Sequence, residues 1–178
     1  MKVLVTGAGG FLGRRLSARL LRDGAQVRLL VLRRDSGRPL PDGEILEGDV
    51  GDPAVARRAA EGVDVVFHLA STYRLQCAPE SVHRAVHVTG TLQLLEASRA
   101  AGVSRFVHCS TVGVHGHVRQ PPANETAPFA PRDVYQRTKL EGELLAMGYC
   151  RERGLPVAVV RPAAIYGPGD DRLKKLYR

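Results

Sequence analysis

Tyr135 and Lys139 form the pattern with the most direct chemical meaning in this sequence, a phenol and an amine four residues apart. Side chains at i and i+4 share one face of a helix, so the two groups are expected to point the same way. A free phenol, with a pKa of about 10, is a poor base near neutral pH, and a neighbouring ammonium group lowers that pKa. The pair is therefore suited to general acid–base catalysis on an alcohol or a ketone.

A hydroxyl group that binds the same substrate oxygen is expected where a buried strand ends, in the stretch Cys109-Ser-Thr-Val-Gly113. Thr111 is the first candidate and Ser110 is the second. The alternative for either hydroxyl is a hydrogen bond to its own backbone, which serine and threonine often form in loops.

Three glycines, Gly7, Gly10 and Gly13, separate the first predicted strand from a helix. Gly7 permits a tight turn, Gly10 lets the backbone approach a pyrophosphate, and Gly13 lets the helix pack closely on the sheet. The helix N-terminus adds unpaired N–H groups and a positive dipole. This context predicts dinucleotide binding, and the alternative is a purely structural turn.

The end of the second predicted strand bears on the choice of dinucleotide. An acid there would bind the 2′-hydroxyl of NAD, whereas an arginine suits the 2′-phosphate of NADP. Arg33 and Arg34 follow this strand, which favours NADP. The alternatives are that both arginines are surface charge, and that Asp35 folds back and restores a preference for NAD.

Aliphatic runs alternate with helical patterns along the chain. Strands are expected at 3–5, 27–32, 45–47, 63–69, 105–109 and 156–160, and helices at 11–21, 53–60, 82–101 and 134–153. Continuously apolar strands are typical of a parallel sheet with helices on both faces. We predict an α/β fold with a doubly wound parallel sheet, a Rossmann fold in strand order 3-2-1-4-5-6, which binds ligands beyond the carboxyl ends of its strands. The proline-containing stretch 116–131 is expected to form a loop across the mouth of the site.

The composition indicates a globular domain, since 44% of the 178 residues are hydrophobic and 25% are charged. The net charge is +8, but the arginines are scattered and only 5% of residues are aromatic, so no nucleic-acid partner is expected. No apolar run approaches the roughly 18 residues of a membrane helix, so no membrane partner is expected either. Cysteines without C-x-x-C spacing and histidines without ligand spacing predict a cytoplasmic protein with reduced thiols and no metal.

Together the motifs resemble the extended short-chain dehydrogenases/reductases of the NAD-dependent epimerase/dehydratase type. The resemblance covers residues 1–170 and implies an NAD(P)-dependent enzyme with a small-molecule substrate. The matching pieces, in order, are Thr6-Gly-Ala-Gly-Gly-Phe-Leu-Gly13, Gly48-Asp-Val50, His68-Leu-Ala-Ser71, Val88-Thr-Gly-Thr91, Ser110-Thr111, Tyr135-x-x-x-Lys139 and Arg161-Pro-x-x-x-Tyr-Gly-Pro-Gly-Asp170.

The resemblance also implies a role for each motif. Thr111, Tyr135 and Lys139 would form the catalytic triad, and Lys139 would also hold the nicotinamide ribose. The implied cofactor-binding residues are Gly7, Gly10, Phe11, Leu12 and Gly13 at the pyrophosphate, Asp49 and Val50 by the adenine, Leu69, Ala70 and Ser71 across the sheet, and Pro162 beside the nicotinamide.

Two histidines depart from the family pattern. His87 stands where the family commonly has asparagine, which puts in doubt a buried hydrogen-bond network behind the cofactor. His115 stands where the family commonly has tyrosine, on the substrate side. It either changes what is bound or is a tolerated ring of similar shape.

The reaction implied by the resemblance is hydride transfer between nicotinamide and a secondary alcohol or ketone, with Tyr135 relaying the proton. Dehydratases of this type carry an Asp–Glu pair directly after the catalytic threonine; Val112 and Gly113 stand there, so dehydration is not expected. Two alternatives stay open: an epimerase for a substrate such as a nucleotide-sugar, and a reductase or dehydrogenase for a hydroxysteroid- or dihydroflavonol-like substrate. A non-catalytic dinucleotide sensor is the alternative from another class, and the Tyr/Lys pair argues against it.

Residues 1–178 are expected to form one NAD(P)-binding Rossmann domain. Related enzymes continue into a smaller substrate-binding portion, so we expect a fragment that lacks this portion, binds the cofactor and turns over slowly. Family members often dimerise through the two long helices after strands four and five, and the sequence permits such a homodimer.

Overall fold

The computed structural model describes residues 1–32, 39–73, 77–118, 121–168 and 170. Arg33 and Arg34, on which the preference for NADP depends, lie outside the described residues. Among the described helices, none combines the length and the apolar character that a membrane span requires.

Six parallel strands form one sheet in the order β3-β2-β1-β4-β5-β6, which confirms the predicted fold class and strand order. Thr6 pairs with His68 and His68 pairs with His108, so three polar side chains stand in a row at the carboxyl edge of the central strands. The strands are β1 (Lys2–Thr6), β2 (Gln26–Val31), β3 (Glu44–Glu47), β4 (Val65–His68), β5 (Arg105–Cys109) and β6 (Val157–Val160).

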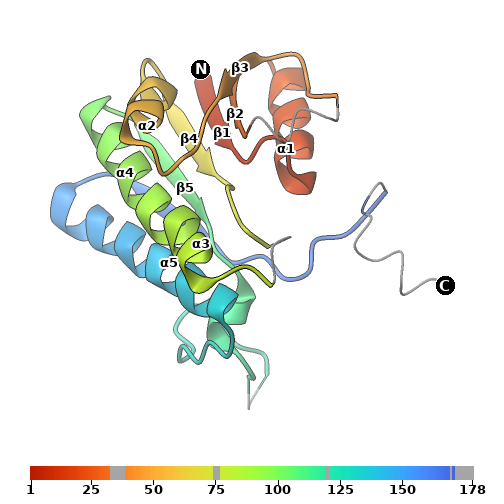
Figure 1. The fold of residues 1–178 in the computed structure, drawn as a ribbon, viewed down its shortest axis with the longest axis vertical. Coiled ribbons are helices and arrows are strands. Elements are labelled where there is room, and N and C mark those ends of the chain that lie inside the picture. The colour runs from red at the N-terminus through yellow and green to blue at the C-terminus, as the bar shows by residue number, and fades with distance from the viewer. Residues whose placement is uncertain (33–38, 74–76, 119–120, 169, 171–178) are drawn as a thin grey trace.

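Helices cover the sheet on both faces, and each face has its own apolar core (Figure 1). Helix α1 (Phe11–Arg22) packs through Leu20 and Leu21 on one face. Helices α2 (Pro53–Ala60), α4 (Gly90–Ala100) and α5 (Val134–Arg153) pack on the other face. The strands are buried between these layers, which explains why they are continuously apolar.

The helix ends follow from local sequence. Asp52 caps α2 by accepting a hydrogen bond from the backbone N–H of Ala54 at 2.7 Å, and Pro53 occupies the first turn. Asp133 caps α5 in the same way, from the N–H of Gln136 at 2.7 Å. Helix α5 ends at Gly154, whose φ of 72° is the left-handed conformation that glycine adopts readily.

The helix predicted at 82–101 forms, but it contains a wider turn. It comprises α3 (Glu80–Arg84), the π-helical turn η2 (Ala85–Thr89) and α4. The hydroxyl of Thr91, at the start of α4, donates to the carbonyl oxygen of His87 in this turn at 2.7 Å. Such turns are rare and often lie at functional sites.

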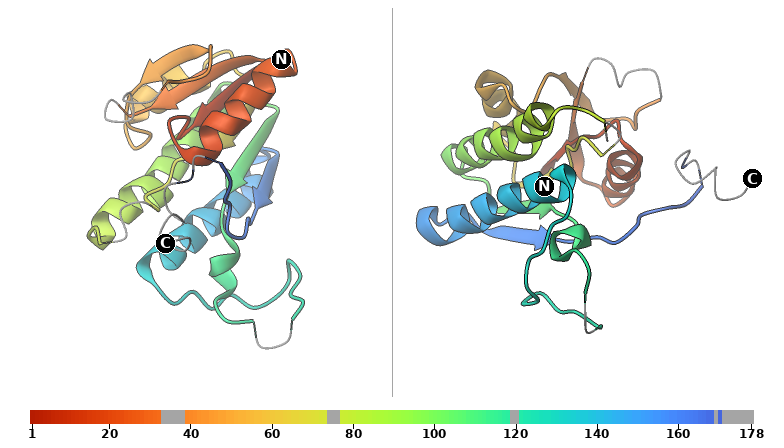
Figure 2. Two further views of the ribbon diagram at one scale, coloured as in Figure 1. Left: turned by 90° about the vertical axis from the view of Figure 1, so that its right-hand side faces the viewer. Right: turned by 60° about the horizontal axis from the view of Figure 1, so that its bottom comes forward.

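Two segments extend beyond the carboxyl edge of the sheet (Figure 2). The first follows the short 3-10 helix η3 (Val112–His115) and is the loop predicted at 116–131. The second follows β6 and runs toward α1, where Arg15 donates to the carbonyl oxygen of Pro168. The guanidinium of Arg15 also stacks 3.8 Å from the ring centroid of Phe11.

Candidate active site

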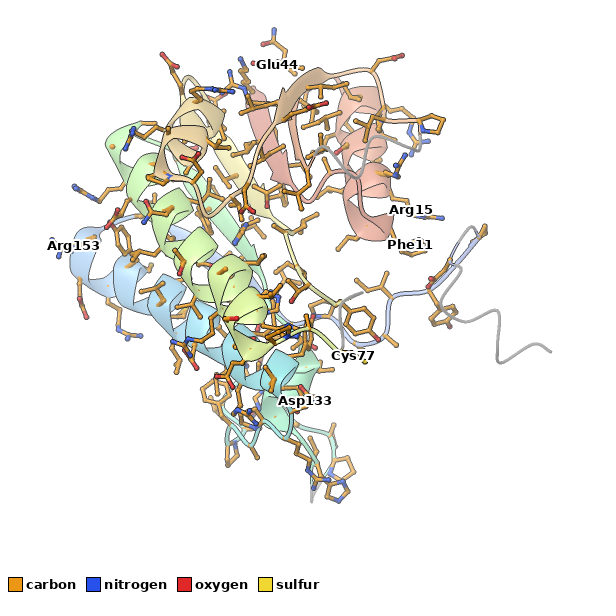
Figure 3. The ribbon with its side chains drawn as sticks, in the orientation of Figure 1. Phe11, Arg15, Glu44, Cys77, Asp133 and Arg153 are labelled. Carbon is orange, nitrogen blue, oxygen red and sulfur yellow. The ribbon has the colours of Figure 1, made fainter. Side chains whose placement is uncertain are left out.

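The three glycines form a close-packed turn. Gly7 has a φ of 64°, and its carbonyl oxygen accepts from the N–H of Gly10 at 2.9 Å. A Cβ atom on Gly13 would lie 2.3 Å from that same oxygen, so only glycine allows α1 to start this close to the turn. Helix α1 has no side-chain cap and no acidic residue in its first turn. The site therefore fits a pyrophosphate, because the first turn of a helix offers backbone N–H groups and a positive dipole. Phe11 and Arg15 stand at this end of α1 (Figure 3).

The segment after β4 joins this turn to the rest of the site. A Cβ atom on Gly7 would lie 2.9 Å from the carbonyl oxygen of Leu69 and 3.0 Å from Cα of Ala70. The N–H groups of Leu69 and Ala70 each donate to the hydroxyl of Thr6 at 3.1 Å. The hydroxyl of the next residue, Ser71, lies 3.3 Å from Nε2 of His87, whose ring meets that of Tyr135 edge-on at 5.3 Å. Three consecutive residues thus connect the glycine turn to the predicted proton donor.

The remaining predicted cofactor residues also follow strands. Asp49 comes two residues after β3, where its carboxylate accepts from the N–H of Gly51 at 2.8 Å. Val50 is buried against Gly90, where a Cβ atom would approach Val50 to 2.6 Å. Pro162 follows β6, and its carbonyl oxygen accepts from the N–H of Val112 at 3.1 Å.

Lys139 is a buried cation, with 4% of its surface exposed. Its ammonium group donates to the main-chain carbonyl of Cys109 at the end of β5. Burial lowers the pKa of Lys139 to about 8, against an opposing influence of Cys109 and Glu143. The group is therefore still an ammonium at neutral pH.

Tyr135 lies one turn before Lys139 on α5, between two other rings. Its ring meets that of Tyr73 edge-on at a centroid distance of 5.4 Å, and that of His87 edge-on at 5.3 Å. Burial raises the pKa of Tyr135, while the neighbouring Ser71 side chain opposes that rise. The sequence pattern predicted a lowered pKa. The difference arises because the phenol is desolvated and the ammonium of Lys139 is directed at Cys109.

The hydroxyl of Thr111 takes part in a local hydrogen bond. It accepts from the N–H of Gly113 at 3.1 Å and so caps η3. A Cβ atom on Gly113 would lie 3.1 Å from the side chain of Gln136, which brings η3 to the first turn of α5, beside Tyr135. Ser110 is buried, and its hydroxyl has no partner among the described residues. The catalytic roles of Thr111, Tyr135 and Lys139 stay predictions.

A directed chain of hydrogen bonds lies behind the site. The hydroxyl of Thr91 already donates to the carbonyl of His87, so Nε2–H of His68 must donate to Thr91 at 3.0 Å. Nδ1 of His68 then accepts from the hydroxyl of Thr6 at 2.8 Å. Burial and the Lys139 cation lower the pKa of His68 to about 3, which keeps this ring neutral. The sequence patterns did not predict the chain.

A buried ion pair fixes the loop after η3. Arg161 Nε donates to a carboxylate oxygen of Glu143 at 3.0 Å, and Glu143 is 1% exposed. The same guanidinium donates to Nε2 of His115 at 3.1 Å and to the carbonyl of Glu125 at 3.0 Å. His115 stacks on Phe129 at 5.5 Å. The sequence patterns did not predict the ion pair between Glu143 and Arg161. Glu143 follows Lys139 by four residues, and Arg161 is the first residue of the motif that ends at Asp170.

Comparisons with known proteins agree with this geometry. A sequence profile of the NAD dependent epimerase/dehydratase family matches residues 3–177. Sterol demethylase protein B of Methylococcus capsulatus is 40% identical over 182 residues, covering 97% of this chain and 54% of that protein. The 3 beta-hydroxysteroid dehydrogenase/Delta 5-->4-isomerase of Mycobacterium tuberculosis is 35% identical over 187 residues, covering 99% and 50%. A UDP-glucose 4-epimerase structure from Thermotoga maritima has a TM-score of 0.86 at 29% identity, covering 94% and 57%.

The doubly wound sheet and the glycine turn define a dinucleotide-binding α/β enzyme. With a family match across nearly its whole length, the chain belongs to the NAD dependent epimerase/dehydratase family. It spans about half the length of the curated relatives it matches. NAD(P) is therefore the cofactor class, and the preference between NAD and NADP stays a prediction.

Proposed function

We propose that residues 1–178 form an NAD(P)-binding domain that oxidises a secondary alcohol, or reduces the matching ketone, of a bulky apolar substrate. The connection from the glycine turn through Leu69, Ala70 and Ser71 to the rings of His87 and Tyr135 carries this proposal. It brings a phosphate-binding turn and a buried proton donor to one edge of the sheet. The bound nicotinamide would supply hydride transfer.

Residues of the chain would bind the cofactor, move the proton and stabilise charge at the substrate oxygen. The N–H groups at the start of α1 bind the pyrophosphate. The phenol of Tyr135 holds the proton that moves to or from the substrate oxygen. The ammonium of Lys139 supplies positive charge in a buried site, where it acts more strongly than in water. The hydroxyl of Thr111 would bind the substrate oxygen.

Two observations support an apolar substrate. Two of the relatives are named a sterol demethylase protein and a 3 beta-hydroxysteroid dehydrogenase. The loop after η3 also borders a pocket of about 640 Å³, most of whose lining is apolar: Val118, Pro122, Ala123, Ala127, Pro128 and Ala130, with His115, His117 and Asn124.

Nucleotide-sugar epimerisation is the second candidate. The likeness to the UDP-glucose 4-epimerase structure favours it. Dehydration is not proposed, because Val112 and Gly113 supply no acid after Thr111.

The test is oxidation of NADPH and NADH with a panel of hydroxysteroid-derived ketones, and epimerisation of UDP-glucose, in wild type and Tyr135→Phe. We expect turnover of an apolar ketone that falls by about 10²- to 10⁴-fold in Tyr135→Phe, with cofactor affinity retained. Turnover of UDP-glucose alone would favour the second candidate. Cofactor binding without any turnover would favour a dinucleotide sensor and contradict the proposal.

The preference for NADP is tested separately. The double variant Arg33→Ala, Arg34→Ala should lose affinity for NADPH and keep its affinity for NADH, because only NADPH carries the 2′-phosphate. An equal loss for both cofactors, or no loss, would contradict an NADP preference.

A further inference from the structure

Tyr73 is a partly exposed aromatic residue at the edge of the candidate active site. It lies in the segment that leaves β4 beyond the carboxyl edge of the sheet (Figure 1), and 44% of its surface is exposed. Its ring meets that of Tyr135 edge-on at a centroid distance of 5.4 Å. None of the motifs described above includes this residue, so its place in the site comes from the structure.

A buried anchor holds the chain beside Tyr73. The preceding residue, Thr72, is 3% exposed, and its N–H donates to Nε2 of His87 at 3.2 Å. The hydroxyl of Thr72 lies 2.6 Å from Nδ1 of His83 and 3.1 Å from Nε2 of His87. Both histidines are buried in the helical region that starts at Glu80. The backbone at Tyr73 is therefore fixed before a ligand arrives, which lowers the entropy cost of packing against its ring.

The burial of successive residues shows which way Tyr73 points. Ser71 and Tyr73 are exposed, whereas Thr72 between them is buried, as in an extended chain whose side chains alternate between two sides. The segment starts at the glycine turn, where Ala70 lies against Gly7. Three extended residues span roughly 10 Å. Tyr73 therefore shares the exposed side with Ser71, at the end of the segment away from the pyrophosphate site.

A fixed ring of this kind is suited to contact with a flat apolar molecule. Aromatic side chains bury a large area at a small cost in rotamer freedom, and contact between two rings adds to the gain from burial alone. The uncharged ring of Tyr73 gives no charge complementarity to the diphosphate of a nucleotide-sugar. A flat apolar ring system beside the phenol of Tyr135 is therefore the ligand that this position favours.

We propose that Tyr73 is a specificity-determining residue, whose ring packs against the flat face of a polycyclic substrate and holds the reacting C–O group beside the phenol of Tyr135. The proposal rests on the proposed function in taking a bulky apolar alcohol or ketone as the substrate. No covalent bond of Tyr73 changes. Because the ring contact is the same before and during the reaction, it lowers KM and leaves kcat nearly unchanged.

The first experiment measures the binding of progesterone, a flat polycyclic ketone, by equilibrium dialysis of the full chain. The protein is saturated with NADP⁺ or NAD⁺, whichever wild type binds more tightly, so that no ketone is reduced. Tyr73→Ala should bind progesterone about 10-fold more weakly, because the ring contact is lost. Tyr73→Phe keeps the ring and should bind like wild type. Leu144→Ala is the control, since Leu144 is a similarly exposed apolar side chain further along α5.

A kinetic comparison separates a substrate contact from a disturbance of Tyr135. In Tyr73→Ala, the KM for progesterone should rise about 10-fold, while kcat and its pH profile stay near wild type. The value of kcat/KM for acetone, which has no ring face, should not change. A fall in kcat for both ketones would mean that the variant acts by displacing Tyr135, and it would overturn the proposal.

A second measurement decides the matter if Tyr73→Ala does not fold. Wild type bound to progesterone should show intermolecular NOEs between the ring protons of Tyr73, assigned with Tyr73→Phe, and the methyl protons of the steroid. Their absence would overturn the proposal.

The binding measurement also separates this proposal from the proposed reaction, because it needs no turnover. Progesterone binding that depends on Tyr73, in a protein that reduces no ketone, would uphold the ring contact and reject the reaction. Ketone reduction that depends on Tyr135, with equal progesterone binding in wild type and Tyr73→Ala, would do the reverse. A wild type that binds no progesterone, or a Tyr73→Ala variant that weakens only UDP-glucose binding, would overturn the assignment of Tyr73 to a flat apolar substrate.

Discussion

At the scale of single residues, Lys139 combines an apparent defect with a functional advantage. Its ammonium group is almost fully buried and has a main-chain carbonyl, rather than a carboxylate, as its direct partner. The carboxylate of Glu143, four residues on, is already bound by Arg161. A buried cation of this kind costs folding free energy, and it supplies an unneutralised positive charge beside the proposed proton donor.

The cost of this cation predicts that removing it stabilises the protein. The pKa of Lys139 falls from an ordinary value of 10.5 to about 8, which corresponds to roughly 3 kcal/mol against the folded state at pH 7. Lys139→Met should therefore raise the free energy of unfolding, by up to about this amount, in urea denaturation at pH 7. Turnover should be lost in the same variant.

The pH dependence gives this prediction its control. Between pH 8 and pH 10.5 the unfolded chain holds a proton on Lys139 that the folded chain has released, so wild-type stability rises with pH across this window. The advantage of Lys139→Met should shrink over the same window. A variant that is less stable than wild type at pH 7 would contradict the assigned cost.

At the scale of elements, the site depends on how closely α5 crosses the π-helical turn. A Cβ atom on Gly142 would lie 2.2 Å from the carbonyl oxygen of His87. Main-chain atoms cannot move aside as a flexible side chain can. Gly142 therefore sets the separation between Tyr135 on α5 and His87 on η2.

The helix α5 contains a matched pair of glycines that tests this crossing. Gly142→Ala should destabilise the fold by about 1–3 kcal/mol, because the added methyl group forces the two helices apart. Gly148→Ala, in the same helix, meets only the far end of Glu152 at 4.0 Å and should stabilise the fold by about 0.5–1 kcal/mol. Urea denaturation of both variants measures the difference, and equal effects would show that the crossing tolerates a side chain.

The elements themselves could largely be predicted from the sequence, because buried strands and amphipathic helices leave strong local patterns. Val3-Leu4-Val5 and the stretch from Phe11 to Leu21 became β1 and α1. The π-helical turn was not predicted, because one wider turn hardly alters the apolar spacing of the helix at 82–101. The positions of Tyr135 and Lys139 followed from spacing, but their pKa values depended on burial and on the carbonyl of Cys109, which only the tertiary structure defines.

At the scale of the whole molecule, the core contains neutral histidines in place of apolar residues. Burial and the Lys139 cation lower the pKa of His68 to about 3 and that of His87 to about 2, and lower that of His108 well below its ordinary value. The His68 ring forms a hydrogen bond with Thr91, and the His87 ring forms one with Thr138. In contrast, neither ring nitrogen of His108 has a partner among the described residues. All three rings are buried, so the folded protein disfavours their protonation much more than the unfolded chain does.

These buried neutral rings predict that the protein unfolds in acid, and that each ring contributes a separate part of the loss of folding free energy. As pH falls below about 6.5, the unfolded chain binds a proton at each histidine and the folded chain does not, so three rings together remove about 4 kcal/mol per pH unit. A domain of ordinary stability should then unfold between about pH 4 and pH 5. The chain has no tryptophan, so far-UV circular dichroism is the suitable probe.

His108→Leu isolates one of these rings. The change removes a titratable ring that is 1% exposed, and it breaks no hydrogen bond among the described residues. The acid midpoint should therefore move to lower pH, by about one pH unit, and the transition should take up about one proton fewer. His117→Leu, an exposed position in the loop after η3, is the control and should leave the midpoint in place. A midpoint that stays fixed or rises in His108→Leu would mean that the buried ring is already protonated or hydrated in the folded protein, against the neutral core described above.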